Sequence, residues 1–594
     1  MRRGILKWWM LVSIRSDLTT IVFPSCKSAA SQTGSCSSSR VIQHSEIGEV
    51  TFSKDGTRHF DDGSDSKENY IAKPVSLRRD PVIWSIATIV GIVLLPALGA
   101  TFEQFDDHNL IRIATSQRVH AQILPAFPLL RILVDDATIK GRFYPLVQIQ
   151  AWLRAKVFGY DAFYDRLTLI GMAIATTFLI YGTMLNSMKD RMTAAVFTLS
   201  LMLCPAAHDL WPHFCRGEHI GMLLTSASLY CLSRSGHQRN MTGFDVVALI
   251  AFLLACLTKE SFFLLAPALI WFRWQGISSL EGASGQPPAF PRIGFAFVLV
   301  AFLTGVAIAA TLITASAGNQ GSRSLHLTVE RSLRALAGPG GIASVVLENS
   351  FCFIPLIVAT AVWLLGATKK FPVNSKTIVF AGLVIIPQTL LYSTRSGFEA
   401  RYAFPLLLGC AAVNAIALQS VLMSEMQTVK IGVLLVGGVW LLRFAQVQFT
   451  ESLNLTAETS CMRRMVEDVA HNIPESGTVV VVAPPKTEAA TSFVIQLGML
   501  GRPNSRVYVR QPAGSDGDTE FGFTGYSNSD PVANEDVDCV VFLLDKAACG
   551  PSPLYENAHF TMKQIECCKY YVSFRRGQIV AVPQLLEYAF RNRI

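Results

Sequence analysis

Long apolar stretches recur from residue 81 to residue 447, with short polar segments between them. About 20 mostly apolar residues form a helix long enough to cross the hydrocarbon core of a bilayer. The pattern therefore predicts an α-helical polytopic membrane protein with about 11 transmembrane helices. The predicted spans are 81–100, 165–186, 193–208, 219–233, 244–258, 260–273, 292–314, 347–366, 377–393, 403–422 and 430–447.

Two of these spans, 244–258 and 260–273, are short and meet at Lys259 and Glu260. They fit either a tight helical hairpin or one kinked element, and the pattern alone leaves both readings open.

The pattern changes after residue 450. Short β-type runs alternate with helical patterns there, which predicts a small α/β domain over residues 450–594. The strand-like runs are 477–484, 506–510, 538–545 and 570–574, and the helical patterns are 457–472 and 488–500. Five cysteines fall in this region, so one or two disulfides are expected if it lies in an oxidising compartment.

Residues 1–80 are rich in Ser, Gly, Asp and Lys and have no sustained apolar periodicity, which predicts a disordered extension. Lys7 interrupts the first apolar run and no small-residue cleavage site follows, so a cleaved signal peptide is not expected. A surface-lying amphipathic anchor and an over-extended start codon both stay open. The remaining chain divides into a transmembrane domain over 81–449 and the α/β domain.

Composition argues against an ordinary soluble enzyme and against a nucleic-acid-binding protein. Hydrophobic residues make up 51% of the chain and charged residues 16%, whereas ordinary soluble proteins are about 25% charged. The net charge of +8 is spread along the loops, so nucleic-acid binding has no support.

Basic residues recur after every second span, and short loops rich in Lys and Arg stay in the cytoplasm. This predicts a cytoplasmic N-terminus and an exterior C-terminus in a multi-pass protein, which we expect in a bacterial plasma (inner) membrane. The long loop 101–164 then faces the exterior. The orienting residues are Arg78, Arg79, Lys189, Arg191, Arg234, Arg239, Arg273, Arg292, Lys369, Lys370 and Lys430.

An acidic cluster follows the first span: Glu103, Asp106, Asp107 and His108. Ionisable groups near the hydrocarbon region are costly, so they are candidates for chemistry. A helix cap is the alternative reading. Later in the same loop, residues 141–163 place apolar positions at helical spacing, which suits a helix at the bilayer surface.

Four sequence blocks resemble segments of a known protein family. They are GRFYPL with FGYDAF in 141–163, CRGEHIGMLLTSASLYCL at 215–232, LACLTKESFFLLAPALIW at 254–271 and FEARYAFPLLLG at 398–409. Together with the acidic cluster they resemble the GT-C superfamily of membrane glycosyltransferases. The resembling branch is that of tetratricopeptide-bearing O-mannosyltransferases and their bacterial relatives. The likeness covers roughly residues 80–425; the chain lacks tetratricopeptide repeats, and Cys215 and Gly217 depart from the pattern around Arg216.

The resemblance implies an inverting, hexosyltransferase-like enzyme. Such enzymes move a sugar from a polyprenyl-phosphate donor to an exterior glycan, lipid or protein acceptor. A carboxylate takes the acceptor proton during the attack, and the resemblance points to Asp106 or Asp107. We favour Asp106, with its neighbour orienting it or binding the acceptor.

A departing lipid phosphate needs cations near the membrane surface. The predicted donor-phosphate residues are Lys259, Arg401 and Arg216. The alternative for each is snorkelling at the interface, or an ion pair with Glu260 for Lys259, Glu399 for Arg401 or Glu218 for Arg216. The expected supporting residues are Glu103, His108, Glu218, Glu260 and Tyr402.

No metal is expected to be required, although carboxylates here could hold Mg²⁺ or Mn²⁺. Candidate ligands are Glu103, Asp106, Asp107, His108, Asp209 and Glu218. Two other functions stay open: a transporter or flippase of a lipid-linked or anionic substrate, and a non-catalytic membrane scaffold. No internal repeat of the kind common in transporters is visible.

Overall fold

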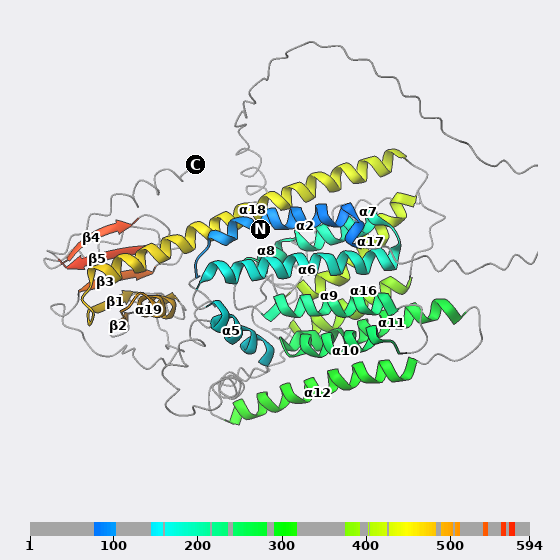
Figure 1. Ribbon diagram of the computed structural model, residues 1–594, viewed down its shortest axis with the longest axis horizontal. Coiled ribbons are helices and arrows are strands. Elements are labelled where there is room, and N and C mark those ends of the chain that lie inside the picture. The colour runs from blue at the N-terminus through cyan, green and yellow to red at the C-terminus, as the bar shows by residue number, and fades with distance from the viewer. Residues whose placement is uncertain are drawn as a thin grey trace, which may run out of the picture. The chain divides into compact units, whose positions relative to one another are not determined.

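The apolar stretches fold into a helical bundle, and the C-terminal region adds a five-stranded sheet (Figure 1). The computed structural model describes residues 77–102, 144–158, 161–213, 217–235, 241–281, 290–317, 375–392, 402, 404–423, 427–482, 489–502, 505–510, 538–543, 560–565 and 570–575. Three described helical stretches are long and apolar enough to cross a membrane. They are Pro81–Gly99, Ala162–Met188 and Gln427–Asn472.

Each predicted span coincides with described helical structure, except 347–366, which lies outside the described residues. The number of membrane crossings stays a prediction. The helices of the bundle are α2 (Pro81–Leu94) with η2 (Leu95–Gly99), α6 (Ala162–Met188), α7 (Arg191–Met202), α8 (Pro205–His208), α9 (Gly217–Ser235), α10 (Gly243–Cys256), η3 (Glu260–Leu265), α11 (Ala266–Glu281), α12 (Phe290–Ala317), α16 (Ser375–Tyr392), α17 (Phe404–Met423) and α18 (Gln427–Asn472).

The folded part of the chain begins a few residues before the predicted start of the transmembrane domain at residue 81. A short turn, η1 (Leu77–Arg79), precedes α2, and Asp80 is only 1% exposed. Asp80 accepts from Val82 N at 3.1 Å and from the Tyr181 hydroxyl at 2.9 Å. The last residues of the predicted 1–80 extension therefore belong to the fold, because this carboxylate caps α2 and ties it to α6.

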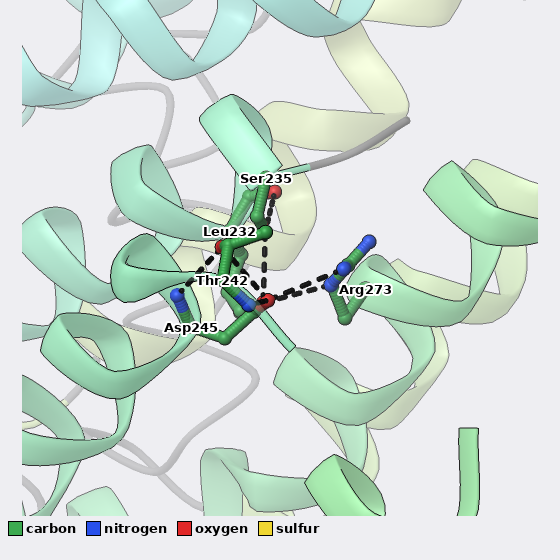
Figure 2. A network of polar contacts seen from close by, with 5 residues as sticks. All are labelled: Leu232, Ser235, Thr242, Asp245 and Arg273. Atoms are coloured by element: carbon green, nitrogen blue, oxygen red, sulfur yellow. Dashed lines mark hydrogen bonds and ion pairs between the residues drawn. The ribbon is translucent and has the colours of Figure 1, made fainter. Parts of the chain in front are cut away.

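The two short spans form a hairpin. Asp245, near the start of α10, is an ion-pair partner of Arg273 in α11, with Nε and Oδ1 2.8 Å apart. This pair is possible only if the chain reverses between the two helices, which excludes one kinked helix. Figure 2 shows the pair together with Ser235 of α9, whose hydroxyl donates to Asp245 at 2.8 Å, and with Thr242, the N-cap of α10.

Arg273 was predicted to be an orienting loop charge, but it is 1% exposed and neutralised by Asp245. Its guanidinium therefore holds α10 and α11 together at one end of the bundle, which we call the Asp245 end.

The helical pattern at 457–472 forms the C-terminal part of α18. This helix of 46 residues also contains the predicted span 430–447 and passes the predicted boundary at residue 450 without a break. The sequence has neither Gly nor Pro between Gly438 and Pro474, so nothing ends the helix when its composition turns polar.

The sheet has the order β2-β1-β3-β5-β4. β1 is parallel to β2 and β3, and β5 is antiparallel to β3 and β4. Sequence patterns predicted each strand that the structure describes except β4, which lies at one edge of the sheet. The elements are β1 (Thr478–Val482), α19 (Ala489–Met499), β2 (Arg506–Arg510), β3 (Cys539–Leu543), β4 (Phe560–Ile565) and β5 (Tyr570–Arg575).

Cys539, on the inner strand β3, is a free thiol with no exposed surface. It is therefore not a partner in the disulfides expected for this region.

Candidate functional site

Three of the predicted site residues lie within the described structure with their side chains: Lys259, Glu218 and Tyr402. The structure brings all three together. The other predicted residues, Asp106, Asp107, Glu103, His108, Arg216 and Arg401, lie outside the described residues, and of Glu260 only the backbone is described.

Lys259 is the centre of the cluster. α10 ends at Cys256, and Lys259 follows with an extended backbone, φ −164° and ψ 142°, directly before η3. Its ammonium forms an ion pair with Glu218 Oε1 and lies 3.7 Å from the centre of the Tyr402 ring. The exposed fractions of the two charged side chains are 12% for Lys259 and 4% for Glu218. The cation is thus held in place by a carboxylate and an aromatic face.

Close backbone approach explains how α9 presents Glu218 to Lys259. A Cβ on Gly217 would lie 2.7 Å from the Thr258 carbonyl oxygen, and a Cβ on Gly221 would collide with the ring of Phe262. Only glycine leaves room for α9 to approach the turn before η3 this closely. Glu218 lies between these glycines, so the contact carries its carboxylate to the lysine.

An aromatic pair supports the other side of the ammonium. The Tyr402 ring is stacked on that of Tyr392 with centroids 5.6 Å apart and planes 8° apart. Tyr392 is 1% exposed at the end of α16. The stack fixes the ring face that Lys259 meets.

The cluster also borders the helix predicted in the first long loop. This helix, α5 (Pro145–Phe158), begins beside the turn that carries Lys259: Leu146 N donates to Leu257 O at 3.0 Å. Val147 lies against Gly217. The late part of loop 101–164 is therefore in contact with the Lys259 cluster, and we call this end of the bundle the Lys259 end.

The sequence pointed to Lys259, Glu218 and Tyr402 as site residues but did not pair Lys259 with Glu218. The alternative for Lys259 was snorkelling or a pair with its neighbour Glu260; the partner is Glu218, 41 residues away in sequence. No local pattern encodes that contact. Tyr392 was also missed, because an aromatic residue at a span end is common at membrane interfaces.

The ammonium of Lys259 has N–H donors beyond the one that its ion pair with Glu218 uses. An ammonium has three N–H donors, and the pair with Glu218 uses one of them. Among the described residues no group of three or more His, Cys, Asp or Glu side chains is placed to hold a metal ion. Of the predicted oxygen ligands, Glu218 is engaged with Lys259.

No protein-family model and no curated protein sequence matches the chain. Among solved structures, the chain is similar to the crystal structure of ArnT from Cupriavidus metallidurans in the apo state. The identity is 13% and the TM-score is 0.44, over 83% of this chain and 97% of that chain. A similarity of this strength assigns neither a family nor a function.

Proposed function

We propose that the chain is an inverting membrane glycosyltransferase that takes its sugar from a polyprenyl-phosphate donor. Lys259 binds the donor phosphate, and the acceptor is an exterior glycan, lipid or protein. The Lys259 end and the α/β region face the exterior of a bacterial plasma membrane, and the N-terminus lies in the cytoplasm.

The observation that carries the proposal is the placement of Lys259. A largely buried ammonium is costly unless it has partners, and this one is fixed at an end of an apolar bundle by Glu218 and the Tyr402 ring. That end is where the phosphate of a membrane lipid would be reached. Arg216 and Arg401 directly precede Gly217 and Tyr402 in the sequence, which supports a shared phosphate site.

The chemistry needs three events. The acceptor oxygen forms a bond to the anomeric carbon, the bond from that carbon to the phosphate oxygen breaks, and the bonding electrons leave with the phosphate. We assign the acceptor proton to Asp106, with Asp107 as its orienting or acceptor-binding neighbour. Lys259, Arg216 and Arg401 stabilise the charge that develops on the phosphate. No step requires a metal; Mg²⁺ or Mn²⁺ could be held by the acidic residues of the first loop.

The test is an in vitro transfer assay with a panel of polyprenyl-phosphate sugars, in which purified wild type is compared with Asp106→Asn and Asp107→Asn. We expect one of these variants to lose at least 100-fold in kcat, in line with general-base catalysis. Full activity in both variants would overturn the catalytic assignment.

Two outcomes support the other functions. Movement of a lipid-linked substrate across proteoliposomes without sugar transfer would make the chain a transporter. A cellular phenotype that survives neutralisation of Asp106, Asp107 and Lys259 together would make it a scaffold.

A further inference from the structure

We propose that the neighbouring residues Asp165 and Arg166, at the start of α6, position the first loop by anchoring the chain on both sides of residues 103–143. The link to catalysis rests on the proposed function, because the predicted carboxylates lie in that segment. The evidence for the anchoring itself is a set of contacts made by described residues at the two ends of the segment 103–143.

The first anchor holds the chain after the segment. Arg154 of α5 pairs with Asp165, with Nε and Oδ1 2.5 Å apart, and the side chains are 6% and 1% exposed. The two residues are 11 positions apart, one near the end of α5 and the other near the start of α6. A charge-assisted bond removed from water is strong and directional, so it fixes where α5 lies.

The second anchor holds the chain before the segment. Arg166 donates from Nη2 to the Thr101 carbonyl at 2.9 Å. Thr101 also exchanges two hydrogen bonds with Thr459 of α18: its N–H donates to Oγ1 at 3.0 Å, and its hydroxyl donates to the Thr459 carbonyl at 2.8 Å. The next residue, Phe102, is 7% exposed and packs with Leu169 against α19.

Helix geometry explains why adjacent residues can serve opposite ends. Consecutive side chains on an α-helix point about 100° apart, so Asp165 faces α5 while Arg166 reaches Thr101. Each side chain suits its partner. The carboxylate of Asp165 binds the guanidinium of Arg154, and the guanidinium of Arg166 donates to the carbonyl oxygen of Thr101. One turn of α6 therefore sets the positions of both points where the loop enters and leaves the bundle.

The test combines hydrogen exchange with kinetics on the full chain. Arg154→Gln is expected to raise amide exchange at least 10-fold across 145–158 while leaving 97–102 unchanged. Arg166→Gln is expected to raise amide exchange at least 10-fold across 97–102 while leaving 145–158 unchanged. Both are expected to lower kcat for sugar transfer at least 10-fold with the donor KM within about twofold, because neither touches Lys259. Lys156→Gln, an exposed change on α5, is the matched control and is expected to alter neither measurement.

Two results would overturn the proposal. One is exchange that is unchanged at both ends; the other is exchange that rises throughout the bundle, including 217–256, which would show general destabilisation. If the wild type transfers no sugar at all, the proposed function fails while the exchange measurements still decide whether the anchors exist.

Discussion

At the scale of single residues, the candidate site depends on one largely buried ion pair. The Lys259 ammonium is 12% exposed and is balanced by Glu218, which is 4% exposed. Removing one partner of a buried pair leaves the other charge uncompensated, which costs about 3–5 kcal/mol, whereas removing both charges costs much less. Stability and phosphate binding can therefore be separated by mutation.

The first prediction uses that separation. Lys259→Gln is expected to lower the melting temperature in detergent, and Lys259→Gln with Glu218→Gln is expected to recover most of the loss. Both proteins are expected to remain inactive, because neither presents an ammonium to the phosphate. Recovery of transfer in the double variant would show that Lys259 serves only to balance Glu218.

The second prediction concerns Tyr402. Its ring face contacts Lys259 at 3.7 Å, an interaction of about 0.5–2 kcal/mol. Tyr402→Phe keeps the ring and should retain donor affinity within about twofold, whereas Tyr402→Leu should weaken it several-fold. Donor titration of the two purified variants measures the difference. Equal losses in both would shift the role from the ring to the hydroxyl.

At the scale of elements, the site depends on how closely α9 approaches the turn before η3. Gly221 has no space for a Cβ because Phe262 occupies it, whereas Gly171 on α6 has nothing within 4 Å of the corresponding point. Adding a methyl group to a filled interface costs about 1–3 kcal/mol. On an open helix face, Ala in place of Gly gains up to about 1 kcal/mol.

The third prediction follows from that contrast. Gly221→Ala should lower the melting temperature and reduce transfer, because the displaced Phe262 lies on the element that begins beside Lys259. Gly171→Ala, the control, should be neutral or slightly stabilising. A thermal scan of both variants decides the matter, and identical behaviour would mean that close approach at Gly221 does not position the site.

The elements also show what sequence could and could not provide. Apolar length alone located α2, α6 and α12, and Leu-Thr-Lys-Glu at 257–260 pointed to the correct turn. The sequence patterns did not identify Glu218 as the partner of Lys259 or Asp245 as the partner of Arg273. The residues of these pairs are 41 and 28 positions apart in the sequence. A local sequence pattern reveals the periodicity of a helix, but it does not reveal which face of one helix packs against which face of another. The continuity of α18 was missed for a related reason, because a change in composition does not end a helix.

At the scale of the whole molecule, α18 connects the bundle to the sheet. Thr459 bonds to Thr101 at the start of the first loop, and α19 packs against Phe102. The α/β region thus contacts the chain next to the acidic cluster. Its own core is closed around Val479, Val481 and Cys539, none of which has exposed surface.

The fourth prediction tests that closed core. Burial raises the pKa of the Cys539 thiol above its ordinary range, and the charge of Asp538 adds to the effect. Because the reactive thiolate is disfavoured in the folded state, Cys539 should resist maleimide at pH 8 and react only after unfolding in denaturant. Mass spectrometry of labelled peptides reads the result. Rapid labelling of the native protein would contradict the buried position of β3.

The most direct test of the account is release of polyprenyl phosphate from a polyprenyl-phosphate sugar by purified protein with acceptor present. Wild type is compared with Lys259→Gln and with Lys376→Gln, an exposed lysine at the start of α16. We predict release by the wild type and by Lys376→Gln at similar rates, and a loss of at least 100-fold in Lys259→Gln. Equal rates in all three proteins, or no release from any donor, would contradict the assignment of Lys259 to the donor phosphate.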